Sequence, residues 1–319
     1  MNRGIILNLI CLCLAAAAQN THSAKKGIQI PGVQIPIADL KPDSELPLAP
    51  HWMIFSDTVL IPNKAGGLNR LGANPVTGTS GLCGGGVAAF KSMWIPSCAD
   101  HALLRFDVKI ANPVRIDTGT GGAVPAVAAN GDSVWILSDD KTTLSRVDPD
   151  QNKVVSELRL GAGCNTLTFG ETALWVTCPS ENRVLRINPE TTLVEQRIAV
   201  SAQPFALAIG ETSLWVLCLK DGRVERIDPK TNRVTKTIET GVSGAAQGGI
   251  AIGQGSVWVT QTGFPLTRID PVTEKVAQQF WGHGGGAIHF GESSIWLTNL
   301  QSGTLWRIDP KRVLATLAE

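Results

Sequence analysis

The sequence lacks an excess of charge of either sign. Its 319 residues include 28 Lys and Arg against 27 Asp and Glu, and without the first 18 residues, which contain Arg3, there are 27 of each. A protein that binds a nucleic-acid backbone concentrates basic side chains on one surface. We therefore expect no nucleic acid among the partners.

Sequence signatures of catalysis and of tight metal binding are also missing. The chain contains no HExxH, GxSxG, EF-hand or paired-carboxylate pattern, and no CxxC or compact Cys/His cluster. Each of these patterns places a nucleophile, a base or a set of metal ligands at the spacing that its chemistry needs. Their absence favours a protein that is not an enzyme and that carries no cofactor.

The N-terminal segment "MNRGIILNLICLCLAAAA" has the layout of a secretory signal. One early Arg precedes an apolar stretch, and small residues follow it. The apolar stretch is short for a membrane span and has no stop-transfer flank. We expect residues 1–18 to be a signal peptide and residues 19–31 a flexible leader. Residues 32–319 would form one exported, monomeric domain, periplasmic or secreted, with no integral membrane segment.

What the sequence does contain is a unit that repeats about every 40 residues. "ETALWVTCPSENRVLRINPETTLV" at 171–194 returns as "ETSLWVLCLKDGRVERIDPKTNRV" at 211–234. Each unit has a Trp between apolar residues, namely Trp94, Trp135, Trp175, Trp215, Trp258 and Trp296. An Arg follows about ten residues later, at Arg105, Arg146, Arg186, Arg226, Arg268 and Arg307. A degenerate copy with Leu60 and Arg70 in these positions makes seven units.

Within a unit, runs of five or six residues rich in Val, Ile, Leu, Trp and Thr alternate with turn residues. Such runs predict short antiparallel strands, four to a unit. Four strands repeated at a fixed period indicate a β-propeller. The predicted fold is therefore all-β, a seven-bladed β-propeller of four-stranded antiparallel blades. We expect the repeated Arg to stack on the neighbouring Trp as a structural spacer.

Two segments are candidates for closing the ring of blades. "GVQIPI" at 32–37 resembles an outer strand and could pair beside the C-terminal blade. "RVLATLA" near the C-terminus competes for the same place. The sequence leaves both alternatives open.

Five cysteines follow the predicted signal. Cys83 and Cys164 each lie eleven residues before a repeat Trp, where a first strand begins, and Cys98 and Cys178 lie where the second strand of the same unit ends. Since these places are adjacent in an antiparallel hairpin, we predict the disulfides Cys83–Cys98 and Cys164–Cys178. Cys218 has Pro204 in its partner's place, so we predict a free, buried thiol there. The alternative is that all five cysteines are reduced core residues.

Candidate binding residues lie in the loops that enter the first strand of each unit. In a propeller these loops surround the mouth of the central channel. The polar side chains they offer are Asn165, Gln203, Gln247 and His283. Most of them are amides, which can orient a polar ligand but are weak general acids or bases. We predict that these four residues bind a partner or a small ligand.

The "LWV…RIDP.T..V" units resemble the YVTN-type repeats of the YncE-like exported propellers, from about Val33 to the end of the chain. That resemblance implies an exported binding or scaffold domain. The chain is also similar, more distantly, to virginiamycin B lyase (streptogramin lyase) and to gluconolactonase-like propellers. The lyase resemblance implies a bound magnesium and a catalytic His in "PH". The matching positions here hold Pro204-Phe205 and Gly285-Gly286, with no His.

Two functions follow from these observations. The first is an exported, non-catalytic propeller that recognises an unknown protein or a small-molecule ligand at its mouth. The second is a metal-assisted enzyme, lyase-like or lactonase-like, that uses Mg²⁺ or Ca²⁺ in a site around His283. Convergence of two or more acidic or His side chains at the mouth would favour the second.

Overall fold

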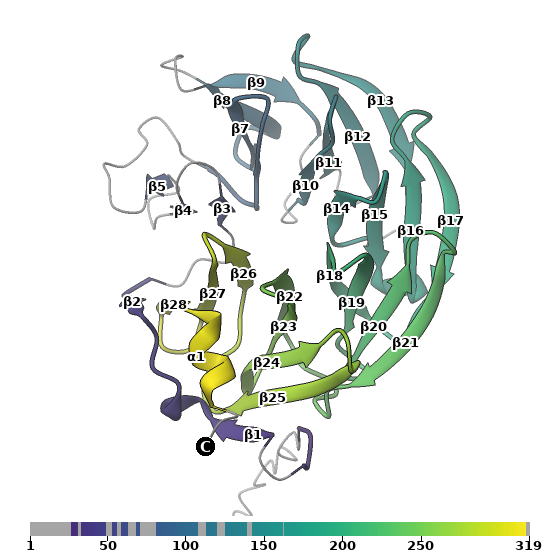
Figure 1. Cartoon of the computed structure of the whole chain (residues 1–319). Coiled ribbons are helices and arrows are strands. Elements are labelled where there is room, and N and C mark those ends of the chain that lie inside the picture. The colour runs from purple at the N-terminus through teal and green to yellow at the C-terminus, as the bar shows by residue number, and fades with distance from the viewer. Residues whose placement is uncertain are drawn as a thin grey trace, which may run out of the picture.

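The computed structural model describes residues 27–30, 33–48, 53–55, 59–62, 68–70, 81–107, 113–119, 125–138, 142–161 and 163–316. Nearly every regular element in these residues is a β-strand, and the strands form sheets arranged in a ring (Figure 1). No helix in this part of the chain is long and apolar enough to cross a membrane.

The first three blades each contain four antiparallel strands, which follow one another in chain order from the inside of the ring outwards. Blade 1 consists of β6 (Val87–Ala89), β7 (Ser92–Ser97), β8 (Ala102–Asp107) and β9 (Val114–Asp117). Blade 2 consists of β10 (Val127–Ala129), β11 (Val134–Ser138), β12 (Thr143–Asp148) and β13 (Lys153–Arg159). Blade 3 consists of β14 (Leu167–Gly170), β15 (Ala173–Cys178), β16 (Arg183–Asn188) and β17 (Leu193–Ala199).

The next three blades repeat this pattern, with additions from the N-terminal segment. Blade 4 consists of β18 (Pro204–Gly210), β19 (Ser213–Cys218), β20 (Arg223–Asp228) and β21 (Arg233–Glu239). Blade 5 consists of β22 (Gly248–Gly253), β23 (Ser256–Gln261), β24 (Phe264–Asp270), β25 (Lys275–Trp281) and an added β1 (Gln34–Pro36). Blade 6 consists of β26 (Ile288–Gly291), β27 (Ser294–Asn299), β28 (Thr304–Ile308) and β2 (Ser44–Leu46).

The prediction of seven four-stranded blades is wrong, because the described residues form six blades. The degenerate first unit forms only a short three-stranded sheet of β3 (Ile54–Phe55), β4 (Val59–Pro62) and β5 (Leu68–Arg70). Its core residues pack on both sides, with Ile54 against blade 1 and Met53 beside Trp296 of blade 6. This unit has Leu60 where the others have Trp, so it lacks the large side chain that fills a full blade.

Ring closure uses neither predicted segment as the outer strand of the last blade. β1, from the first candidate, pairs in parallel with β25 in blade 5. The second candidate contributes to α1 (Pro310–Ala315), a helix capped by Asp309. The outer strand of blade 6 is β2, which pairs antiparallel with β28. Two 3₁₀ turns complete the elements, η1 (Ile37–Asp39) and η2 (Pro179–Glu181).

Each repeat Trp fills the space between its blade and the next. All six are fully buried, and Trp215 of blade 4 lies in one cluster with Val257 and Val259 of blade 5. The indole Nε1 of Trp215 donates to the carbonyl of Gly210 at the end of the innermost strand, at 3.2 Å. A Cβ on Gly210 would lie 2.7 Å from Ile252 of blade 5. Glycine ends this strand because the neighbouring blade leaves no room for a side chain.

The repeated Arg is structural, as predicted, and it joins consecutive blades. Five of the six lie over their Trp rings at 5.0–5.5 Å. In blade 3, Arg186 Nη1 also donates to the carbonyl of Pro229 and to Asn232 Oδ1, both in a turn of blade 4. The contact therefore fixes one blade against the next.

Candidate functional site

The loops of this ring gather on two opposite faces. Because the four strands of a blade alternate in direction, the loop entering the first strand and the loop joining the second to the third lie on the same face. We call this face the mouth. The loops joining the first strand to the second and the third to the fourth form the opposite face, which we call the turn face.

Both predicted disulfides are confirmed, and both lie at the mouth. Cys83 is bonded to Cys98 in blade 1 and Cys164 to Cys178 in blade 3. Each bond joins the loop entering the first strand to the end of the second strand. Two entering loops are therefore covalently fixed to the body of the ring.

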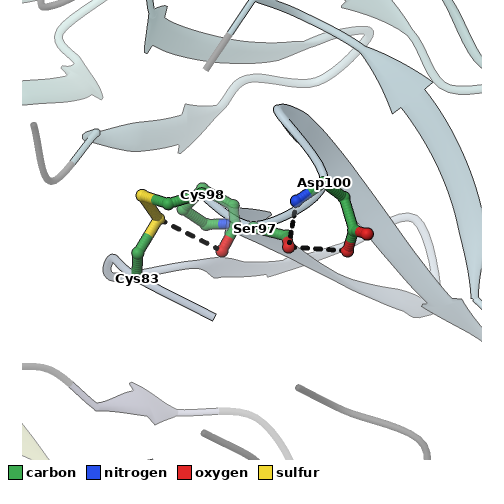
Figure 2. The surroundings of a disulfide bond; sticks show 5 residues. Cys83, Ser97, Cys98 and Asp100 are labelled. Atoms are coloured by element: carbon green, nitrogen blue, oxygen red, sulfur yellow. Dashed lines mark hydrogen bonds between the residues drawn. A yellow bond between two sulfur atoms is a disulfide. The ribbon is translucent and has the colours of Figure 1, made fainter. Parts of the chain in front are cut away.

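Hydrogen bonds reinforce the Cys83–Cys98 hairpin (Figure 2). The amide of Cys83 donates to the carbonyl of Pro96 at 3.2 Å, and the amide of Cys98 donates to that of Gly81 at 3.1 Å. Ser97 Oγ donates to Asp100 Oδ2 at 2.7 Å and accepts from the Asp100 amide. These hydrogen bonds hold the loop on both sides of the disulfide.

Cys218 has no disulfide partner, as predicted. It is a buried free thiol in blade 4, and it pairs in register with Pro204, which occupies the position of a second cysteine. Burial raises the pKa of the Cys218 thiol well above its ordinary value, and the Glu225 carboxylate adds to that shift. The thiol therefore stays protonated and unreactive in the folded protein.

Asn165 lies in the loop entering blade 3, but its side chain makes an internal contact. Its Nδ2 donates to the carbonyl of Phe205 in blade 4 at 3.0 Å, and Thr166 Oγ1 donates to the same carbonyl at 2.6 Å. Asn165 thus joins two blades. Its donor group is engaged before any ligand arrives.

Gln203, Gln247 and His283 lie in the loops entering blades 4, 5 and 6, and all three are exposed. Their backbones are held by the other mouth loops. The amide of Gln203 donates to Asn182 Oδ1 at 3.0 Å, and the carbonyl of His283 accepts from Asn299 Nδ2 at 3.3 Å. The mouth therefore combines an ordered backbone with exposed polar side chains.

One residue that the sequence did not single out lies beside this set. Trp281, at the end of β25 and two positions before His283, is 48% exposed, unlike the six repeat Trp residues. Its place outside the repeat pattern is the only sequence signal that separates it from them.

The donor set at the mouth does not fit a magnesium or calcium ion. In the described part of the chain, no three His, Cys, Asp or Glu side chains gather so that they could hold a metal. The four candidate binding residues are amides and one imidazole, whereas these hard cations prefer carboxylate oxygens. The exposed acids Asp100 and Glu181 also lie at the mouth, but in loops of different blades, 1 and 3. His289, on the innermost strand of blade 6, is neutral at neutral pH and only a weak proton acceptor, because burial lowers its pKa to about 4.

The fold defines the chain as a β-propeller protein, with a disulfide-braced mouth. No family model matches the sequence, and no curated protein matches it. Among solved structures, the chain is similar to virginiamycin B lyase from Staphylococcus aureus, with a TM-score of 0.67 and 16% identity over 83% of this chain and 97% of that one.

Two further structures share the architecture. BamB from Moraxella catarrhalis gives a TM-score of 0.62 and 12% identity over 80% of this chain and 81% of that one. The computationally designed Ika8 protein gives 0.66 and 13% over 80% and 81%. Likeness at this level of identity shows the fold alone, so the YVTN-type assignment stays a prediction.

Proposed function

We propose that this chain is an exported binding or scaffold propeller that recognises a partner protein or a small polar ligand at its mouth without catalysing a reaction on it. The observation that carries the proposal is the position of the two disulfides. Both fix mouth loops, in blades 1 and 3, and the described turn face carries none. Rigid loops bind with less loss of conformational entropy.

The chemistry of the exposed side chains supports recognition over catalysis. Gln203 and Gln247 offer amide donors and acceptors, and His283 adds an imidazole. Such groups orient a ligand through hydrogen bonds and bring no paired acid and base. The two disulfides are also compatible with an exported protein.

A capture experiment tests the site. The purified protein, the triple variant Gln203→Ala, Gln247→Ala and His283→Ala, and a control variant are immobilised and exposed to the exported fraction of the producing cells. The control changes Gln196→Ala, Arg197→Ala and Lys275→Ala, exposed residues of outer strands. We expect at least one component to bind the wild type and the control but not the triple variant. Equal capture by all three would contradict the mouth as the binding surface.

A metal assay separates the two functions. The purified chain is dialysed against Mg²⁺ or Ca²⁺ and its bound metal is measured by atomic emission. We expect less than one ion per chain for each metal. A stoichiometric ion that is lost in the triple variant would overturn the non-catalytic proposal.

A further inference from the structure

The turn face contains a recess in which one of the repeat arginines is more exposed than its counterparts. Arg226 in blade 4 shows how such an arginine is bound within the ring. Its Nη1 donates to the carbonyl of Pro271 at 3.3 Å and to Glu274 Oε1 at 2.9 Å, both in the Asp-Pro turn of blade 5. The other carboxylate oxygen of Glu274 lies 3.8 Å from Lys236 Nζ. The Glu274 carboxylate is therefore an internal example of a carboxylate bound beside a repeat arginine.

Arg307 of blade 6 is placed in the same way but lacks the acceptors. Its Nε donates to Ser294 Oγ at 3.0 Å, and its guanidinium lies over Trp296 at 5.3 Å, as in the other blades. Within the described residues, no turn of a following blade accepts from its Nη groups. The Arg307 side chain is 41% exposed, against 24% for Arg226 and 18% for Arg186.

The space in front of Arg307 is a recess of about 730 Å³ between blades 5 and 6. Gln254, Ser293 and Lys311 line it with Arg307, together with Ser44, which is paired with Arg307 across the strands. The Lys311 ammonium forms no ion pair with a described residue. A guanidinium whose Nη groups donate no hydrogen bond within the described residues, next to a second cation and hydroxyls, is a site for a carboxylate.

The acidic groups of the recess are mostly engaged elsewhere. Asp43 accepts from Arg312 Nε and from the amide of Asp309, each at 2.5 Å. Asp309 Oδ1 accepts from the Lys311 amide at 2.9 Å as the cap of α1. Glu292 is the remaining acid, and its nearest approach to the Arg307 guanidinium is 4.0 Å, beyond hydrogen-bond distance.

We infer that this recess binds a carboxylate group from outside the propeller, held by the Nη donors of Arg307 with Lys311 and Ser44 beside it. The ligand is either a small carboxylate or an acidic peptide segment that takes the place Glu274 has beside Arg226. The site lies on the turn face and does not depend on the mouth.

Isothermal titration with three probes tests the inference. The peptide acetyl-Asp-Pro-Val-Thr-Glu-amide reproduces the blade 5 turn that Arg226 binds, and acetyl-Asn-Pro-Val-Thr-Gln-amide, which has no carboxylate, is the control. Sodium acetate and glutamate represent free carboxylates. We expect the Glu peptide to bind and the control peptide to bind at least tenfold more weakly, because an ion-paired carboxylate is replaced by an uncharged amide. Comparable binding of acetate and glutamate would identify small carboxylates as the ligand class.

Two variants locate the binding. Arg307→Gln should reduce affinity at least tenfold. Lys311→Ala, whose ammonium is not ion-paired within the described residues, should reduce it without affecting the fold. Arg226→Gln is the matched control and should leave affinity unchanged. If no probe binds at millimolar concentration, or if binding is the same in Arg307→Gln and Lys311→Ala as in the wild type, the inference is wrong.

Discussion

One position on the innermost strand, paired with the repeat Trp, differs in residue type between blades. In blades 2, 4 and 5 the residue paired with the repeat Trp is alanine, at Ala128, Ala208 and Ala251. In blade 6 the same position holds His289, paired with Trp296. Burial lowers the pKa of this imidazole to about 4, because the charged form loses its hydration between the blades.

His289 should make the fold sensitive to acid. The pKa of His289 is near 4 in the folded state and near 6.5 when unfolded, so between these values the unfolded chain binds the proton and the folded one does not. The free energy of unfolding that His289 contributes by staying neutral is fully present above pH 6.5. About 2–3 kcal/mol of it is lost as the pH falls toward 4. Urea unfolding at pH 7.5 and 4.5 should show a smaller loss for His289→Ala than for the wild type. The same loss in both would count against a buried neutral imidazole.

At the scale of an element, β2 and α1 form a clasp between an N-terminal and a C-terminal segment of the described residues. β2 pairs with β28, and Asp43, just before β2, holds both Arg312 and the amide of Asp309 at the start of α1. The clasp is therefore a short strand fixed by one carboxylate.

Asp43→Ala should weaken this clasp. It removes two hydrogen bonds to a charged group that is partly exposed, so we expect a loss of about 1–2 kcal/mol in the free energy of unfolding. In hydrogen exchange, the amides of 44–46 should exchange faster in Asp43→Ala than in the wild type, and those of the inner strands should not change. Asp39→Ala, which changes an exposed acid outside the clasp, is the control. A clasp that exchanges no faster than in the wild type would show that Asp43 does not hold it.

The strands of the repeat could be predicted from the sequence, but the closing elements could not. Trp, Arg and Asp-Pro recur at fixed spacing because each blade solves the same packing problem. β2 is the tripeptide Ser-Glu-Leu, which is too short to show a strand pattern of its own. The Asp309-Pro310 pair looks like the turn signal of the other units, yet here Pro310 begins a helix that Asp309 caps.

The candidate site, too, could be predicted from the sequence only in part. The position of Asn165, Gln203, Gln247 and His283 in the entering loops follows from the repeat, and the structure places all four there. Whether such a side chain is available to bind a ligand depends on its contacts with the neighbouring blade. The amide of Asn165 is bound to the carbonyl of Phe205, some 40 residues away, and nothing in the local sequence indicates that contact.

For the whole molecule, the two disulfides each stabilise a single blade, one in blade 1 and one in blade 3. Cys164 and Cys178 are fully buried, whereas Cys83 and Cys98 are half-buried. Each closes a short loop, with separations of 15 and 14 residues. A cross-link of this length stabilises by about 3 kcal/mol, mainly by restricting the unfolded chain.

Replacing each pair by serine should therefore destabilise the protein unequally. Cys83→Ser with Cys98→Ser should cost about 3 kcal/mol in chemical unfolding. Cys164→Ser with Cys178→Ser should cost more, because it also buries two hydroxyls. If Cys164→Ser with Cys178→Ser lowers the free energy of unfolding less than the other double variant does, burial does not explain the difference between the two disulfides.

Cys218 provides a probe of the opening of the whole ring. Its thiol is buried and its pKa is raised, so native protein should not react with an alkylating reagent at pH 8. Modification should follow the denaturant dependence of global unfolding, measured by tryptophan fluorescence. Labelling at low denaturant, before fluorescence changes, would reveal a local opening of blade 4.

The clasp also fixes the order in which the molecule can be completed. Asp43 and Asp309 are 266 positions apart, so during synthesis β2 emerges long before the strand it pairs with. Blade 6 must wait until β28 has left the ribosome. A nick in the connection between β2 and β3 would leave the N-terminal piece attached only by noncovalent contacts, and a separately added peptide covering residues 27–48 could then re-form a complete circle.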